Sequence, residues 1–171
     1  MNRDELLQAI KTDLEGKLAD FFERSDRRIY LTVEPEHSLE ANRYLVEKGG
    51  RLATASGVDC RDWVEVCYHY CFDPLGLVVT VKARAYKPEC ELEAVAQFLP
   101  GAMFIEREIR DLLGVKFLNH PDPRRLILAD DWPEGVYPLR KDYNHEAHVN
   151  TGRAVSPDPG RARVLSTLRR G

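Results

Sequence analysis

The amino-acid sequence predicts an α+β fold, in which a mainly antiparallel sheet has helices packed on one face and a long extended C-terminal arm follows. Apolar residues recur at helical spacing near the N-terminus and again just before Gly114. Between these segments, over residues 51–86, the apolar period changes to two, which is typical of strands. Beyond Gly114 the periodicity fades and six prolines follow. We therefore divide the chain into an α+β domain at residues 1–115 and an extended arm at residues 116–171.

In the N-terminal part we expect a helix, a strand and a second helix. The first helix is predicted by apolar residues close to the i, i+3/i+4, i+7 spacing, namely Leu6, Leu7, Ile10, Leu14, Leu18 and Phe21. Arg28–Val33 is short and β-prone, so it predicts a strand. Pro35 suits the first turn of the second helix, and Gly49-Gly50 suits its end.

Three strands and two helices are expected next. The strands are residues 51–58, 62–72 and 75–86, and the tight turn Asp73-Pro74 joins the last two. A short helix is expected over residues 91–98, before Pro100-Gly101. Another is expected over residues 102–113, ending at Gly114, which suits a left-handed helix cap. An aperiodic arm of about 50 residues is too long for an ordinary loop, so we expect it to be disordered or to lie across a partner.

Length and composition describe an ordinary globular chain. The 171 residues are 43% apolar and 31% charged, enough to build a core without disulfide or metal staples. The longest apolar run, residues 75–81, is far shorter than the roughly 18 residues of a membrane span. The first residues lack the apolar core of a secretory signal. We therefore expect neither a membrane-spanning nor a secreted protein.

The charges are unevenly distributed along the chain. The net charge is −3, so no general basic field is present and we expect no nucleic-acid partner. From Arg140 onward seven basic residues face three acids, which leaves +4 on the last 32 residues and −7 on the first 139. An acidic body with a basic tail indicates a tail that docks on a partner.

Three residues on the strand at 62–72 could at first sight bind a metal: Cys67, His69 and Cys71. On a strand they share one face, with successive members roughly 6.5–7 Å apart, whereas zinc ligands converge at about 2.0–2.3 Å from the ion. We therefore favour reduced, buried thiols beside a hydrogen-bonded His69, and keep a Cys/His metal-binding protein as the alternative.

Other catalytic patterns are absent from the sequence. No Gly-x-Ser-x-Gly elbow occurs, and no cysteine-protease context surrounds the thiols. Neither Gly-x-x-x-x-Gly-Lys nor Gly-x-Gly-x-x-Gly is present, which disfavours nucleotide binding by this chain alone.

The helix at residues 102–113 has one apolar stripe and many charges. Ile105, Ile109, Leu112 and Leu113 form the stripe, Glu106 and Glu108 flank it, and Arg107, Arg110 and Asp111 are expected to face away. Taken alone, the pattern predicts a surface helix with ion pairs such as Arg107–Asp111. Glu106 and Glu108 point nearly opposite ways, so a shared acid–base site is disfavoured.

The order of residues in and after this helix resembles a known family. The motifs, in chain order, are Glu106-Arg-Glu-Ile-Arg-Asp-Leu-Leu-Gly-Val115, Phe117, His120-Pro-Asp122, Arg124-Arg-Leu-Ile-Leu128, Asp131-Trp132 and Pro138-Leu-Arg-Lys-Asp-Tyr143. This series is similar to the family of the 30 kDa subunit of respiratory complex I, the NADH:quinone oxidoreductase. The related subunit of energy-converting membrane-bound [NiFe] hydrogenases shares it.

The resemblance implies a subunit of an oxidoreductase complex with no active site, metal or other cofactor of its own. Its arm would hold the large catalytic subunit (49 kDa-like, or the [NiFe] hydrogenase large subunit) beside a neighbouring iron–sulfur subunit. The membrane would be contacted only indirectly, with the chain peripheral on the cytoplasmic face of the cell membrane. The interface residues it implies are Glu106, Arg107, Glu108, Asp111, His120, Arg124, Arg125, Trp132, Arg140, Lys141 and Asp142.

Two departures from respiratory members favour the hydrogenase branch. Leu113 stands where respiratory members commonly have an aromatic residue, and residues 133–137 separate Trp132 from Pro138-Leu-Arg-Lys-Asp142. A subunit of respiratory NADH dehydrogenase proper is the alternative.

Overall fold

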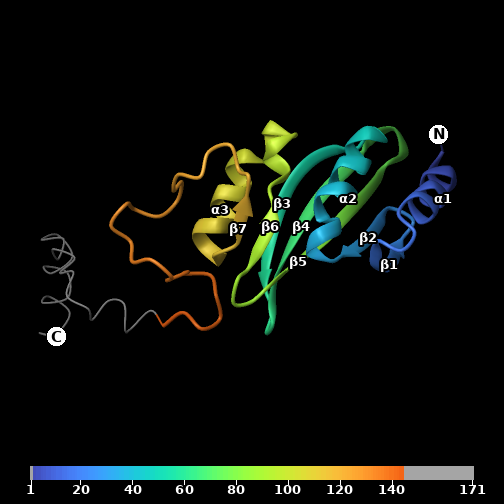
Figure 1. The fold of residues 1–171 in the computed structure, drawn as a ribbon. Helices are drawn as coiled ribbons and strands as arrows, with labels where there is room; N and C mark the ends of the chain where they lie inside the picture. The colour runs from blue at the N-terminus through green and yellow to red at the C-terminus, as the bar shows by residue number, and fades with distance from the viewer. Residues whose placement is uncertain (1, 145–171) are drawn as a thin grey trace, which may run out of the picture. The chain divides into compact units, whose positions relative to one another are not determined.

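The computed structural model describes residues 2–144 as helices, strands and a final irregular segment (Figure 1). The helices are α1 (Arg3–Asp13), α2 (Pro35–Glu47) and α3 (Met103–Leu113). The main-sheet strands are β1 (Leu18–Ser25), β2 (Arg28–Val33), β3 (Arg51–Asp59), β4 (Trp63–Phe72) and β5 (Leu77–Tyr86). Two short strands, β6 (Glu91–Glu93) and β7 (Lys116–Leu118), pair separately. The chain divides into two compact units, Met1–Lys141 and Asp142–Gly171, and the first contains all of these elements.

The five-stranded sheet has the order β1-β2-β5-β4-β3. Neighbouring strands are antiparallel except β2 and β5, which are parallel. The predicted strands at residues 62–72 and 75–86 are confirmed as β4 and β5, joined by a single helical turn at Asp73–Leu75. The mainly antiparallel α+β fold class is therefore confirmed.

One face of the sheet carries the core, because alternate residues of β4 and β5 point to it. Tyr68 and Tyr70 of β4 are fully buried on this face, opposite Val81 and Val79 of β5. The Tyr70 hydroxyl donates to Asn42 Oδ1 of α2 at 2.8 Å. The Tyr68 hydroxyl donates to Glu106 of α3, also at 2.8 Å. Both helices therefore cover the same face, as the sequence predicts.

The predicted first helix is wrong in its second half. It ends at Asp13, and Leu18 and Phe21 lie in β1, which pairs with β2. A turn with Gly16 at φ +76° separates the two elements. The spacing of Leu14, Leu18 and Phe21 fits a helix, but pairing with β2 overrides this local preference.

The helix predicted over residues 91–98 is also wrong. This stretch forms β6 and a single turn at Val95–Gln97. The backbone N–H groups of Val95 and Ala96 donate to the Glu106 carboxylate rather than to helical carbonyls. β6 pairs in parallel with β7, a strand that the sequence does not predict. Among residues 2–144, no helix has the length and apolar character needed to cross a membrane.

Candidate functional site

The candidate site is α3 together with residues 115–141, which fold back on it. α3 ends at Gly114, whose φ of +74° confirms the predicted left-handed cap. A Cβ on Gly114 would overlap the Tyr137 ring, so the glycine also allows the returning chain to pack closely. Two terminal carbonyls of α3 are satisfied by this segment: Leu112 accepts from the Leu139 N–H at 3.1 Å and Leu113 from Arg140 Nε at 2.7 Å.

Glu106 joins α3 to the sheet and to the β6 region. It is fully buried, and its carboxylate accepts from the Tyr68 hydroxyl and from the backbone N–H groups of Val95 (2.7 Å) and Ala96 (3.1 Å). Burial raises the pKa of Glu106 to about 7, although these three donors oppose the rise. The carboxylate therefore organises three segments from the interior.

His120 lies beside Glu106, with Nε2 3.6 Å from Glu106 Oε2. Its Nδ1 accepts from the Asp122 N–H at 3.1 Å, and its Nε2 contacts the Met103 carbonyl at 3.2 Å. Since a carbonyl only accepts, Nε2 carries the proton and the ring is neutral in this arrangement. Burial also lowers the pKa of His120.

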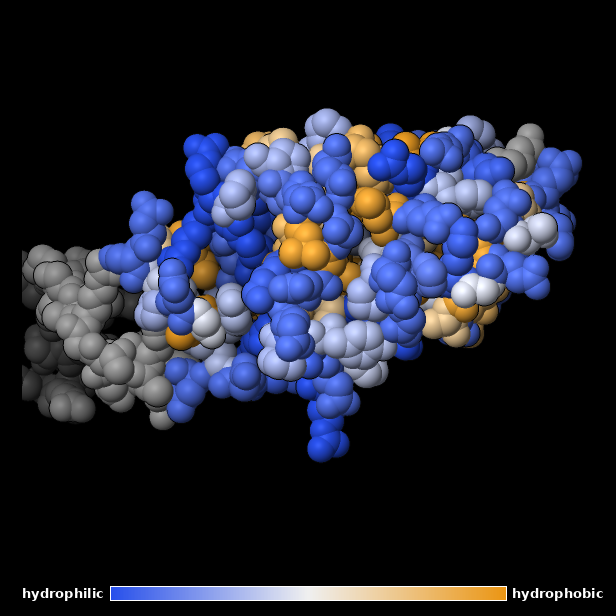
Figure 2. Space-filling model, viewed as in Figure 1, coloured by the Kyte–Doolittle hydropathy of each residue, from blue (hydrophilic) through white to orange (hydrophobic). Residues whose placement is uncertain are grey.

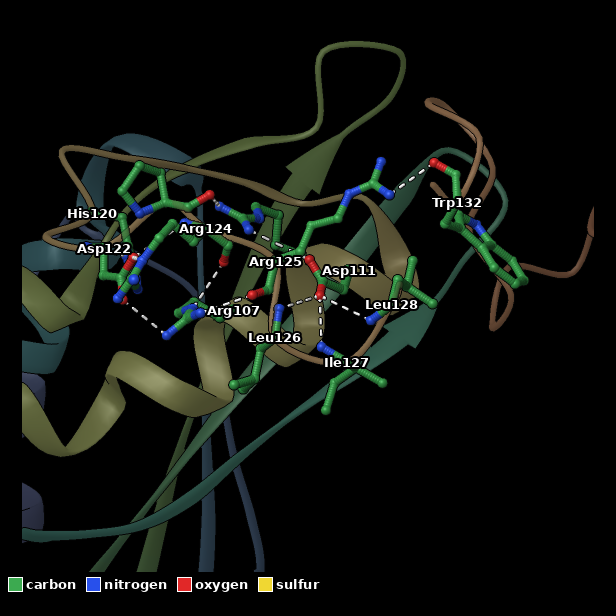
Figure 3. Close-up of polar contacts among 12 residues, drawn as sticks. Arg107, Asp111, His120, Asp122, Arg124, Arg125, Leu126, Ile127, Leu128 and Trp132 are labelled. Atoms are coloured by element: carbon green, nitrogen blue, oxygen red, sulfur yellow. Dashed lines mark hydrogen bonds and ion pairs between the residues drawn. The ribbon is translucent and has the colours of Figure 1, made fainter. Parts of the chain in front are cut away.

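Arg107 holds the start of the returning segment (Figure 3). Its guanidinium donates to the carbonyls of Arg124 (2.9 Å) and Arg125 (2.8 Å) and pairs with Asp122 at 2.9 Å. Asp122 also accepts two bonds from the Arg124 side chain, at 2.7 and 2.8 Å, which lower the pKa of this carboxyl. Arg107 is 7% exposed, so its charge is satisfied within the fold.

Asp111 holds the next turn through a single oxygen (Figure 3). Its Oδ2 accepts from the backbone N–H groups of Leu126 (2.7 Å), Ile127 (2.9 Å) and Leu128 (3.4 Å). Burial alone would raise the pKa of Asp111, but the three N–H donors and Arg110 lower it overall. Successive N–H groups around one anion form a rigid concave turn.

The remaining predicted residues fix the later part of the segment. Arg125 donates through Nη1 to the Ala129 carbonyl at 2.9 Å and the Trp132 carbonyl at 2.8 Å. The indole N–H of Trp132 donates to the Val136 carbonyl at 2.8 Å. Arg140 lies over the Tyr137 ring, and the Lys141 N–H donates to Asp59 of β3 at 2.9 Å.

The expectation that Arg107 and Asp111 face away from the core side is wrong. Both are buried, because the segment returning from residue 122 covers that side of α3. In place of the expected Arg107–Asp111 pair, Arg107 bonds Asp122 and Asp111 bonds Arg110 and backbone amides. Glu106 is buried rather than flanking an exposed stripe.

Of the other predicted interface residues, Glu108 is half-buried, Arg124 and Lys141 are exposed, and Asp142 lies in the second unit. The basic residues from Arg153 to Arg170 lie outside the described residues. Sequence reasoning missed Tyr68, Asp59 and Tyr137, which anchor the segment from β4, from β3 and from the segment itself.

The finished segment displays apolar side chains. Leu126 is 38% exposed, Ile127 51% and Leu139 60%, although the backbone around each is hydrogen-bonded. Beside them lies a cavity of about 390 Å³, lined by Trp132, Tyr137 and Leu128 together with Arg110 and Arg125. Rigidly held apolar groups next to cationic ones are typical of a protein-binding surface.

The strand thiols show no metal-binding arrangement within the part of the chain that the structure describes. His69 bonds Thr80 Oγ1 at 2.9 Å and Ser56 Oγ at 3.2 Å, which confirms the prediction of a hydrogen-bonded histidine. Burial raises the pKa of Cys67 to about 12, so the thiol is not activated. Within residues 2–144, no three His, Cys, Asp or Glu side chains are placed to hold a metal ion.

The fold is that of a subunit of a respiratory membrane complex. It matches a chain in the structure of the membrane-bound sulfane sulfur reductase, an archaeal respiratory membrane complex, with a TM-score of 0.75 and 24% identity. The match covers 85% of this chain and 88% of that one. At this identity the likeness concerns the fold alone.

Residues 31–149 match the family described as the respiratory-chain NADH dehydrogenase 30 kDa subunit, and the chain belongs to this family. It is 38% identical over 122 residues to a subunit of the F420H2 dehydrogenase of Methanosarcina mazei, covering 68% of this chain and 75% of that protein. It is 34% identical over 147 residues to hydrogenase-4 component G of Escherichia coli. This second match covers 82% of the chain but only 26% of that relative, so the chain spans about a quarter of its length.

Proposed function

We propose that this chain is a non-catalytic, cofactor-free subunit of the hydrophilic arm of a complex I-like membrane oxidoreductase. It binds the large catalytic subunit through an arm at residues 116–171, whose described part is the segment returning across α3. The observation that carries the proposal is the use of the motif charges: Arg107, Asp111 and Arg125 all hold backbone groups of that segment. These charges therefore serve to shape a surface.

The length of the hydrogenase-4 component G relative supports a large partner. The region that this chain matches makes up 26% of that protein, so the remaining three quarters are joined to it covalently. Where the matched region is a separate chain, a non-covalent interface has to replace that covalent link. We assign this interface to the large catalytic subunit, with an iron–sulfur subunit as neighbour.

The hydrogenase branch is favoured over respiratory NADH dehydrogenase. Similarity to hydrogenase-4 component G extends over 82% of the chain. The insertion of residues 133–137 also lies within the described site, where Gly135 and Val136 help to line the cavity. In this proposal the chain is peripheral on the cytoplasmic face of the membrane and contacts it only through its partners.

The proposal is tested by affinity purification of the tagged full chain from its native membranes in mild detergent, with mass spectrometry of the bound chains. We expect a hydrogenase-type large subunit together with iron–sulfur subunits. Flavin- and NADH-binding subunits in their place would assign the respiratory branch. A chain recovered alone would contradict the proposal.

Two matched variants test the surface itself. Ile127→Lys places a charge on the segment, and Phe22→Lys places the same charge on β1 at a side chain of similar exposure, 51% against 54%. Because charges are excluded from interface centres, Ile127→Lys should lower recovery of the large subunit by about tenfold or more. Phe22→Lys should leave recovery unchanged. Equal recovery with both variants would exclude Ile127 from the interface.

A further inference from the structure

The two edges of the five-stranded sheet differ in their protection against strand pairing. β1 carries Asp20, Glu23 and Arg24 and has two register shifts against β2. β3 has no charged residue between Arg51 and Asp59, and its register with β4 is unbroken from Thr54 to Asp59. Charges and irregular register are the usual means of blocking an exposed edge. The β3 edge lacks the charges and is regular over most of its length.

The β3 edge is also unoccupied by other described parts of the chain. β3 pairs with β4 alone, and within residues 2–144 no backbone hydrogen bond joins residues 52–58 to another segment. Every second residue of such a strand directs its N–H and C=O away from its partner. Ala53, Thr54 and Ser56 are exposed, and Val58 is 48% exposed. The edge therefore presents a row of backbone groups ready to pair.

An apolar groove of about 160 Å³ runs between this edge and α3. One wall is Ile105, Ile109 and Leu112 of α3 with Leu139, and the other is residues 55–57 of β3. Side chains of successive strand residues point to opposite faces, so a groove lined by all three follows the edge itself. A Cβ on Gly57 would overlap Leu113, and the missing side chain lets α3 pack this close to β3.

Glu108 supplies the single charge that lines this groove. The other charged residues of the helix motif are paired within the chain: Glu106, Arg107, Arg110 and Asp111. Glu108 makes no hydrogen bond or ion pair with any residue from 2 to 144. A half-buried carboxylate at an apolar groove is complementary to a basic group on the occupant.

We infer that an extended segment of the partner subunit adds to β3 as a sixth strand. Its alternate apolar side chains enter the groove beside α3, and a Lys or Arg lies against Glu108. Strand addition at a sheet edge beside a groove is a recurrent mode of peptide recognition, with affinity from backbone bonds and specificity from side-chain pockets. The inference rests on the proposed function, since the partner is the one that the returning segment also contacts. The groove and that segment share Leu139.

Backbone amide exchange, measured at single-residue resolution on the free full chain and on the purified complex, tests this inference. In the free chain, alternate amides of residues 52–58 should exchange rapidly and the intervening ones slowly, because only the latter bond β4. In the complex the fast set should slow by about 100-fold or more, since opening would then require the added strand to leave. Side-chain docking without strand addition would not give this two-residue period.

A pair of edge variants provides the matched control. Ala53→Lys places a charge on the β3 edge and Ala19→Lys places one on the β1 edge; both alanines are exposed and both lie at a register shift. We expect Ala53→Lys to lower recovery of the partner by about tenfold, as edge lysines block strand pairing. Ala19→Lys should leave it unchanged.

Three outcomes would overturn the inference. If the complex forms but the β3 amides exchange as in the free chain, strand addition is wrong and the proposed function stands. If no complex forms, both are wrong. If the free chain is a dimer whose β3 amides are already slow, a second copy of this chain is the occupant instead of the partner subunit.

Discussion

At the scale of single residues, the site depends on buried carboxylates with opposite pKa shifts. Asp111 accepts three backbone N–H bonds and Arg110 lies nearby, so its charged form is favoured and its pKa is lowered. Glu106 also accepts three bonds, but its complete burial outweighs them and its pKa is raised to about 7. The number of donors alone does not decide the charge state, because desolvation acts against them.

The raised pKa of Glu106 predicts a stability change between pH 4.5 and 7. In the unfolded chain the carboxyl ionises near 4.5, whereas in the folded chain it holds its proton to about pH 7. The folded state therefore binds more protons in this window, and the free energy of unfolding should fall by about 3 kcal/mol as pH rises through it. Denaturant unfolding at half-unit pH steps measures this change.

Glu106→Gln should remove this fall, while the matched variant Glu108→Gln, two residues along α3, should retain it. The lowered pKa of His120 acts in the opposite direction, because the unfolded chain protonates first as pH drops below about 6.5. Subtracting the Glu106→Gln curve from that of the unchanged chain cancels this contribution to first order. A difference curve that is flat from pH 4.5 to 7 would show that Glu106 is ionised throughout.

At the scale of elements, the structure shows what sequence patterns can and cannot predict. The bounds of α3, β4 and β5 are predicted to within about two residues, because each has a strong period and a clear terminator. β1 is missed because Leu18 and Phe21 also fit a helix, and only pairing with β2 decides between them. The buried side of α3 is missed because a segment without periodicity covers it.

The site residues could be predicted from their order but not from their chemistry. The motif series identifies Arg107, Asp111 and Arg125 as important, and the structure places all three against the returning segment. Their contacts are to backbone groups, which leave no trace in residue type. Tyr68 and Asp59 lie far away in sequence, so no local spacing connects them to α3.

The contact between Asp111 and the turn at residues 126–128 gives a prediction at this scale. Asp111→Asn keeps the size of the side chain but replaces a charged acceptor of three N–H bonds by a neutral one. We expect a loss of about 1–3 kcal/mol in the free energy of unfolding and faster exchange of the amides of Leu126 and Ile127. Asp130→Asn, on the exposed surface of the same segment, should change neither. Unaltered exchange in Asp111→Asn would mean that the turn holds itself.

At the scale of the whole molecule, the described fold is stabilised from within and its surface is available for partners. The face in Figure 2 is mostly hydrophilic, with small and separate apolar areas. The exposed apolar side chains of the site are Leu126, Ile127 and Leu139, all in the segment returning across α3. The segment therefore has two roles: it covers the charged side of α3, and it presents the surface that we assign to the partner.

These two roles predict different results for two truncations. A chain ending at residue 141 keeps the whole first unit, so its free energy of unfolding should match that of the full chain within about 0.5 kcal/mol. A chain ending at residue 115 removes His120, Asp122 and the amides bound to Asp111, and leaves buried charges without their partners. Loss of partners for buried charges costs about 3–5 kcal/mol, so this shorter chain should be partly unfolded.

Recovery of the large subunit separates the two parts of the proposed arm. If residues 116–141 suffice for docking, the chain ending at residue 141 should recover as much partner as the full chain. If the basic residues beyond Asp142 contribute, its recovery should fall, and the loss should be smaller at high salt because exposed charges are then screened. A chain ending at residue 115 that folds fully would show that the α+β domain is independent of the segment. The buried positions of Arg107 and Asp111 argue against that result, since each is shielded by residues beyond 121.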